Sequence, residues 1–191
     1  GEMISNKSVY EIVYIGAISE ERGIVELITA INLLKGKVKL NLAGNFSDIN
    51  LFTLVSNMDG WEFVEFFGQV SRTEVKNILS RSSAGIVNFL PAANHIESQP
   101  NKMFEYMSAA LPLLCSNFPL WVEIIEKHNC GISFDPTNPD SIAKSIETLL
   151  DNAENCKQLG MNGRKAVKEF FNWDIEEKKL FKMYDDLINT L

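Results

Sequence analysis

The sequence predicts an α/β domain: a doubly wound, parallel, six-stranded Rossmann-like sheet with helices on both faces and a helical C-terminal tail. Three observations support this prediction. Short runs of β-branched and aromatic residues alternate with segments of helical apolar spacing over residues 10–150. The run at 84–90 is apolar almost throughout, as expected of a strand that is covered on both faces. After residue 150 only the helical pattern continues.

Six segments have the composition and length of strands. Three of them lead into a glycine, Gly16, Gly44 or Gly68, and glycine permits the tight turn that must follow the strand. The expected strands are 10–18, 38–43, 61–67, 85–90, 111–115 and 130–134.

Helices are expected between these strands and after the last one. Gly36 ends the first helix, and Ser71 with Glu74 forms a capping box that opens the third. Pro139 stands in the first turn of the last helix before the tail, where proline is tolerated. The expected helices are 24–34, 49–57, 71–79, 102–109, 120–127 and 139–150, with a tail at about 154–191 that breaks at Asn172 and Trp173.

Size and composition indicate a single domain, residues 1–191. The chain is 46% hydrophobic and 23% charged, which suits one large α/β domain and excludes a disordered chain. The formal net charge of −7 argues against nucleic-acid binding, which requires a basic face. The same charge argues against docking of this segment on an anionic membrane.

The three cysteines, Cys115, Cys130 and Cys156, are odd in number and have no CxxC spacing. This pattern favours free thiols in a reducing cytoplasm over disulfides or a zinc site. No apolar run approaches the roughly 20 residues that span a bilayer. The first residues lack the pattern of a signal peptide.

The segment 95–116 is the first candidate for a ligand site. It has the pattern of a loop, a helix and a strand, with Glu97 in the loop and Glu105 one to two turns into the helix. Open α/β sheets bind ligands beyond the carboxyl ends of their strands, beside helix N-termini. The two carboxylates are too far apart to share a proton, but they suit hydroxyl groups at opposite ends of an extended ligand. The alternative is that both are ordinary surface residues.

The turn after the first strand is the second candidate. Residues 16–23 place Arg22 just before a helix, where an arginine and backbone amides can form an anion pocket. The turn matches neither the P-loop nor the GxGxxG pattern. The alternative is an ordinary turn with Arg22 in solvent. His95 could line a pocket, although a lone loop histidine is more often incidental.

Together these segments resemble the C-terminal, donor-binding domain of a retaining GT-B glycosyltransferase of the glycogen synthase-like, group one superfamily. The resemblance covers nearly the whole chain, and the motifs occur in the family's order. The corresponding segments are Gly16-Ala17-Ile18 with Arg22-Gly23, the strand 40–44, the Val-x-Phe-x-Gly-x-Val-like segment 64–70, the E-x7-E pair Glu97 and Glu105, the following segment to 114, and the late aromatic pair Phe171 and Trp173.

The resemblance implies binding of a nucleotide-diphosphate sugar. Glu105 would accept hydrogen bonds from the ribose hydroxyls, and Glu97, as the catalytic residue, would contact the donor sugar. The backbone near Gln69 and Val70 would meet the base.

The resemblance also implies a place for the diphosphate, which would be held by Arg22 and the amides around Ser98 and Gln99, beside Gly16. These groups would stabilise the negative charge of the leaving group. No metal and no other cofactor is expected, because GT-B enzymes usually need none.

One departure from the family bears on the site. The family's phosphate-binding arginine falls on Ala17, and the usual lysine is Arg22, so one cation of the expected pair is missing. We expect Lys102, at the start of the motif helix, to replace it. Pro100 removes one amide donor from the preceding loop.

A GT-B enzyme binds its acceptor on a separate N-terminal domain, which we expect to be absent from this chain. The chain would then bind the donor without useful transfer, and its tail would leave Leu180, Phe181 and Tyr184 exposed. The whole protein would be a hexosyltransferase of cell-surface polysaccharide synthesis, cytoplasmic or peripheral to the inner face of the membrane, with a lipid-linked or polysaccharide acceptor. The alternatives are a nucleotide-sugar epimerase on the same fold and a non-catalytic nucleotide-binding module.

Overall fold

A six-stranded parallel sheet forms the centre of the computed structural model, which describes residues 9–188. The predicted domain limits at residues 1 and 191 lie outside this range. The strand order is β3-β2-β1-β4-β5-β6, so that the winding reverses between β1 and β4. The strands are β1 (Tyr10–Ile15), β2 (Val38–Ala43), β3 (Val64–Gly68), β4 (Ala84–Val87), β5 (Leu113–Ser116) and β6 (Gly131–Phe134).

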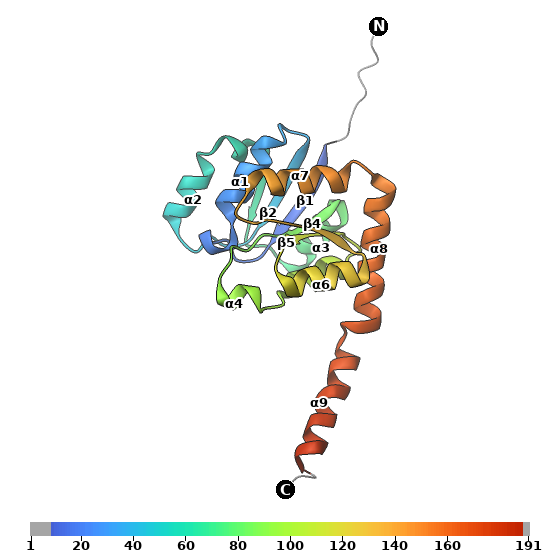
Figure 1. Cartoon of the computed structure of the whole chain (residues 1–191). Coiled ribbons are helices and arrows are strands. Elements are labelled where there is room, and N and C mark those ends of the chain that lie inside the picture. The colour runs from blue at the N-terminus through green and yellow to red at the C-terminus, as the bar shows by residue number, and fades with distance from the viewer. Residues whose placement is uncertain (1–8, 189–191) are drawn as a thin grey trace.

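Helices cover both faces of the sheet, as predicted. Figure 1 shows α1 and α7 on one side and α3 and α6 on the other. The α-helices are α1 (Ile24–Leu33), α2 (Ile49–Ser56), α3 (Arg72–Arg81), α4 (Ala93–Ile96), α5 (Asn101–Ser108), α6 (Pro119–His128), α7 (Pro139–Leu150), α8 (Ala153–Phe170) and α9 (Trp173–Ile188), and the short 3-10 helices are η1 (Glu20–Arg22) and η2 (Asp59–Phe63).

Two apolar cores lie on the two faces of the sheet. Successive strand residues point to opposite faces, so Ile12 enters the core beneath α1 and α7, and Val13 enters the core beneath α5 and α6. Both side chains are fully buried. A sheet buried on both faces confirms the doubly wound fold that the alternating pattern predicts.

The local signals at helix starts are confirmed. The Ser71 hydroxyl accepts from the Glu74 amide, and the Glu74 carboxylate accepts from the Ser71 amide, so the capping box is complete. Pro139 is the first residue of α7, and the Asn138 side chain caps that helix.

The predicted strand at 61–67 is wrong in its first half. Residues 59–63 form η2, and β3 starts only at Val64. Gly60 lies directly against the carbonyl oxygen of Ile28 in α1, where a Cβ atom would overlap that oxygen. The aromatic residues Trp61 and Phe63 pack against the core, so their burial comes from η2 and not from a strand.

The other strands that are shorter than predicted include β1 and β4, while β5 and β6 are each shorter by one residue. β1 ends at Ile15 because the chain turns at Gly16, which has a φ of 128°. β4 ends at Val87, and the Phe89 amide donates to the side-chain hydroxyl of Ser116 in β5, not to a backbone carbonyl. The Asn88 side chain donates to Gly23 O at the start of α1.

The tail consists of α8 and α9, with the predicted break at Asn172; its last predicted residues, 189–191, lie outside the described range. α8 packs on the domain through buried residues such as Leu159 and Ala166. α9 extends away from the domain and has no buried residue (Figure 1). Leu180, Phe181 and Tyr184 are exposed, as predicted. Among the described residues, no helix is both long and apolar enough to cross a membrane.

Candidate functional site

A cavity of about 480 Å³ lies at the carboxyl ends of β1 and β4. This is the point where the winding of the sheet reverses, the usual ligand site of open α/β sheets. The volume is within the range of small-molecule sites. Five of the predicted site residues line it: Gly16, Arg22, Ser98, Lys102 and Glu105. The remaining lining residues are Ile15, Phe89, Asn94, His95, Pro100 and Asn101.

The floor of the cavity is backbone at the end of β1. The Gly16 amide donates to Ala43 O at 2.9 Å, and a Cβ atom on Gly44 would overlap Gly16 O. The two turns that follow β1 and β2 are therefore packed backbone to backbone. The Ile15 amide donates to the Tyr106 hydroxyl at 2.8 Å, which joins the floor to α5. Tyr106 is fully buried, so this hydrogen bond fixes the helix against the strand end.

Phe89, two residues beyond β4, is the centre around which the site is arranged. The Arg22 guanidinium carbon lies 5.1 Å from the centroid of its ring, and Lys102 Nζ lies 5.2 Å from it. The His95 and Trp121 rings pack at 4.8 and 5.5 Å between centroids. One buried aromatic side chain therefore holds both cations of the cavity, each within cation–π range.

Lys102 occupies the first turn of α5, and its side chain is buried. Nζ lies 3.8 Å from the centroid of the Tyr14 ring. Among the described residues, no atom accepts a hydrogen bond from this nitrogen, and the atom itself is inaccessible to solvent. Burial, followed by the charge of Arg22, lowers the pKa of Lys102 to about 7, and Glu105 opposes the shift. A buried cation without a hydrogen-bond acceptor is costly and therefore unusual.

Arg22 closes the cavity from the turn after β1. Its guanidinium donates to Ala17 O at 3.3 Å, and the Tyr14 hydroxyl donates to the same oxygen at 2.8 Å. Burial raises the pKa of Tyr14 to about 12, so this phenol stays protonated at neutral pH. The turn therefore places Arg22 beside Lys102, as an anion pocket requires. The alternative in which Arg22 extends into solvent does not fit this half-buried side chain.

The loop between α4 and α5 is held by an indole. Trp121, from α6, donates through Nε1 to Ser98 O at 2.6 Å. Ser98 donates to His95 O through both its hydroxyl and its amide, at 3.0 and 3.2 Å. His95 Nδ1 lies 3.0 Å from Leu90 O. His95 is therefore buried and structural on one side, while it lines the cavity on the other.

Four predicted site residues are not among those that line the cavity. Glu97 and Gln99 are exposed on the loop before α5. Gln69 and Val70 follow β3 at the edge of the sheet, where the Asn45 side chain donates to Gln69 Oε1 at 3.2 Å. The roles of all four stay predictions. The Ser98 amide, proposed for the diphosphate, donates to His95 O in this structure.

Four lining residues were not predicted from the sequence: Ile15, Phe89, Asn94 and Asn101. Phe89 falls inside the apolar run 84–90, where nothing distinguishes it from a strand residue. Asn101 immediately precedes Lys102 and could have been inferred, because a helix start was expected there. The described residues include no group of three or more His, Cys, Asp or Glu side chains placed to hold a metal ion.

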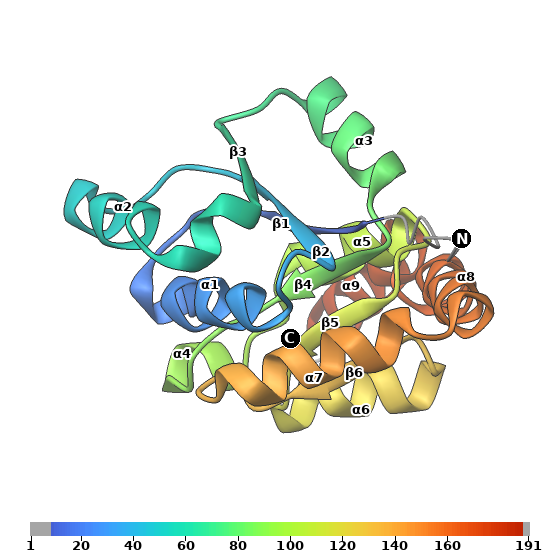
Figure 2. The same cartoon turned by 90° about the horizontal axis from the view of Figure 1, so that it is seen from above.

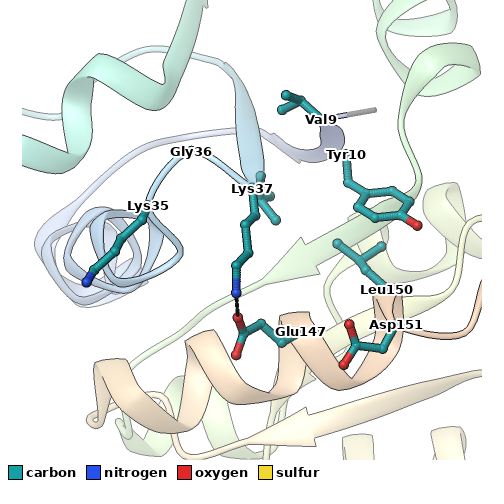
Figure 3. Close-up of a pocket in the computed structure, with 9 residues that line it drawn as sticks. Val9, Tyr10, Lys35, Gly36, Lys37, Glu147, Leu150 and Asp151 are labelled. Atoms are coloured by element: carbon teal, nitrogen blue, oxygen red, sulfur yellow. Dashed lines mark hydrogen bonds and ion pairs between the residues drawn. The ribbon is translucent and has the colours of Figure 1, made fainter. Parts of the chain in front are cut away.

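A second cavity, of about 270 Å³, lies at the opposite end of the strands, beside the amino ends of β1 and β2 (Figure 3). Its walls are the start of β1, the turn before β2 and the end of α7, joined by an ion pair of 2.7 Å between Lys37 and Glu147. Both of these side chains are largely exposed. The amino ends of parallel strands are not where such sheets bind ligands, and one solvated ion pair does not define a site.

Comparison with known proteins identifies the family. The model of the family described as "Glycosyl transferases group 1" matches residues 3–166. The chain belongs to this family. The membership and the doubly wound α/β fold agree with the GT-B glycosyltransferase resemblance of the sequence.

Two curated glycosyltransferases are similar over most of the chain. An uncharacterized glycosyltransferase of Methanocaldococcus jannaschii is 26% identical over 188 residues, which cover 97% of this chain and 51% of that protein. The capsular polysaccharide biosynthesis glycosyltransferase CapM of Staphylococcus aureus is 23% identical over 179 residues, which cover 92% of this chain and 46% of CapM. The chain thus spans about half the length of these relatives.

A solved structure shows the same fold. The crystal structure of Anabaena HepE in complex with UDP-glucose aligns with a TM-score of 0.79 at 14% identity. The alignment covers 93% of this chain and 49% of HepE.

Proposed function

We propose that this chain is the donor-binding half of a retaining glycosyltransferase that transfers a sugar from a nucleotide-diphosphate sugar to an acceptor. One observation carries the proposal: Arg22 and Lys102 converge on a cavity at the reversal of the sheet, and the Lys102 ammonium has no acceptor of its own among the described residues. An anion that enters this cavity would give both cations a partner. The UDP-glucose in the HepE structure supports a nucleotide sugar as that anion.

Different lining residues bind different parts of the donor. Arg22 and Lys102 bind the diphosphate, and Glu105, which projects from the next turn of α5, accepts from the ribose hydroxyls. During transfer the bond from the anomeric carbon to the phosphate oxygen breaks, and the electron pair stays on the phosphate. Two fixed cations stabilise that growing charge more than they stabilise the intact donor.

The remaining predicted residues contact the outer parts of the donor. Glu97 contacts the transferred sugar, and Gln99 with the Ser98 region contacts the phosphate beside Gly16. Gln69 and Val70 meet the base beyond the cavity. Because these residues surround the lined cavity on two sides, the donor would reach from the end of β3 to the loop before α5.

The setting of the reaction is proposed from the relatives. CapM acts in capsular polysaccharide biosynthesis, which supports a role in cell-surface polysaccharide synthesis with a lipid-linked or polysaccharide acceptor. The acceptor would bind on an N-terminal domain of the whole protein. Transfer would take place in the cytoplasm or at the inner face of the membrane, without a metal.

Calorimetric titration of the 191-residue chain with UDP, GDP and ADP tests the proposal. We expect saturable binding of one diphosphate, and a tenfold to hundredfold weaker affinity in Glu105→Ala, because charged hydrogen bonds to the ribose are worth about 1.5–3 kcal/mol in total. Glu123→Ala removes an exposed carboxylate from α6 and is the matched control, which should bind normally. Absence of binding to all three diphosphates would refute the donor-binding function.

Lys102→Ala should weaken the binding of a nucleoside diphosphate much more than the binding of the corresponding nucleoside. The reason is that Lys102 lines the cavity beside Arg22, whereas the nucleoside carries no charge for the ammonium to bind. The same titrations, made in parallel with UDP and uridine or their counterparts, measure both affinities. Equal losses for the two ligands would show that Lys102 does not contact the diphosphate.

Ala17 favours a second candidate, a non-catalytic nucleotide-binding module. It is exposed at the turn where the family resemblance places an arginine, so the charge of the site depends on Arg22 and Lys102. Binding of a nucleotide sugar by the full-length protein, with neither transfer nor hydrolysis, would favour this candidate.

A further inference from the structure

Lys102 is built into the domain in a way that disfavours its charge when the cavity is empty. Its Nζ is buried between the Tyr14 and Phe89 rings, at 3.8 and 5.2 Å from their centroids. No described atom accepts a hydrogen bond from it. An ammonium needs three acceptors or water to replace its hydration, so this environment suits the neutral amine better than the cation.

Two further groups act in the same direction. The Arg22 guanidinium lies on the same Phe89 ring, 5.1 Å from its centroid, and arginine does not give up its proton. Lys102 also stands in the first turn of α5, where the positive end of the helix dipole repels a cation. Of the two neighbouring cations, Lys102 is therefore the one that can yield its charge.

Three groups favour the charged form of Lys102. The faces of Tyr14 and Phe89 attract a cation, and Glu105, one turn along α5, favours the ammonium. Glu105 is exposed, so solvent screens much of its effect. The balance leaves the pKa of Lys102 at about 7, so that the side chain changes charge within the neutral range.

We propose that Lys102 is mostly uncharged in the empty site above neutral pH and takes up a proton when the diphosphate of the donor enters, so that donor binding and proton uptake are one coupled step. This inference rests on the proposed function, because it requires an anion in the cavity. Nζ is shielded from solvent in the empty site, so the coupled step includes a rotation of the Lys102 side chain toward the cavity. There the phosphate oxygens supply the acceptors that the empty site lacks and restore the ordinary preference of lysine for its charged form. The proton comes from the solvent.

The other titratable groups that face Lys102 do not supply this proton uptake. Arg22 is always charged, and the Tyr14 phenol keeps its proton because burial raises its pKa to about 12. Glu105 is exposed and is unchanged in the Lys102→Met variant, so that variant controls for it. His95 lines the same cavity and carries an imidazole, so it needs a control of its own.

Titration calorimetry in buffers of different ionisation enthalpy measures the coupling. UDP-glucose, ADP-glucose and GDP-mannose are titrated in turn, because a diphosphate esterified at both ends does not itself titrate near neutral pH. The slope of observed heat against buffer enthalpy gives the protons taken up. With a pKa of about 7 for the free lysine, we expect about 0.9 proton per donor at pH 8 and about 0.1 at pH 6. Affinity should then fall as pH rises above 7, by up to about tenfold per pH unit.

Three variants identify the group that is protonated. Lys102→Arg keeps a permanent charge and should bind the donor without proton uptake, and Lys102→Met should bind more weakly, also without uptake. His95→Asn keeps a hydrogen-bond donor near the Leu90 carbonyl and should retain uptake, whatever its affinity. Uptake that persists in Lys102→Met, or that disappears in His95→Asn, would overturn the proposal.

The outcomes separate this inference from the function on which it rests. Saturable binding with zero slope at pH 8 would refute proton coupling and leave the donor-binding function intact. No saturable heat with any of the three nucleotide sugars would overturn both.

Discussion

Gly44→Ala should unfold the domain at a much lower urea concentration than the unchanged chain requires, with a loss of about 4 kcal/mol in the free energy of unfolding. Gly44 has a φ of 144°, which side chains rarely adopt, and its Cβ would overlap Gly16 O. The neighbour is backbone and cannot rotate away. Because Gly16 forms the floor of the cavity, nucleotide binding should also fall.

Gly68→Ala is the matched control for Gly44→Ala. Gly68 ends β3 and also has a positive φ, of 63°, but no atom lies within 4 Å of the position of its Cβ. Only the conformational cost of about 1–2 kcal/mol is expected there. Urea denaturation followed by circular dichroism measures both variants. Similar losses for the two glycines would show that the contact between the two turns has little energetic weight.

Trp121→Ala should cost about 3–5 kcal/mol, the range for a large aromatic side chain deleted from a core. Trp121 is fully buried, packs on Phe89 and Phe118, and holds Ser98 O by its indole N–H. Its loss would leave both a cavity and an unpaired carbonyl. The loop before α5 would lose its anchor, so donor affinity should fall along with stability.

Trp173→Ala provides the comparison, since Trp173 is 67% exposed at the start of α9. A change within about 0.5 kcal/mol is expected for it. Trp121→Phe keeps an aromatic ring and removes the hydrogen bond, so it separates packing from the bond to Ser98 O. Equal unfolding free energies for Trp121→Ala and Trp173→Ala would contradict the anchoring role of Trp121.

The fold follows from local patterns that the tertiary structure did not override. Strand-like and helical segments alternate clearly, and the turn glycines and the Ser71 capping box mark element ends that the structure confirms. The failure at residues 61–63 has a specific cause. Trp61 and Phe63 have strand-forming side chains, but Gly60 lets the backbone approach α1, where the chain forms the 3-10 helix η2.

Site residues could be predicted where a charged side chain stands next to an expected strand end or helix end. Arg22, Lys102 and Glu105 are charged residues next to expected strand or helix ends, and all three line one cavity. Phe89 was not predictable, because its role depends on what surrounds it in space: Arg22 and Lys102 are 67 and 13 residues away along the chain. An apolar side chain in an apolar run carries no mark of such a role.

The exposed position of α9 has a consequence for the rates at which backbone amide hydrogens exchange with solvent. This helix of 16 residues has no buried side chain, and its own hydrogen bonds, the Asn172 cap and short-range pairs such as Lys179 with Glu176 keep it formed. Isolated helices near this length are marginal in water. The amide hydrogens of α9 would therefore exchange with solvent through helix–coil opening in α9 alone, while those of β1 and β4 would exchange only when the whole domain unfolds.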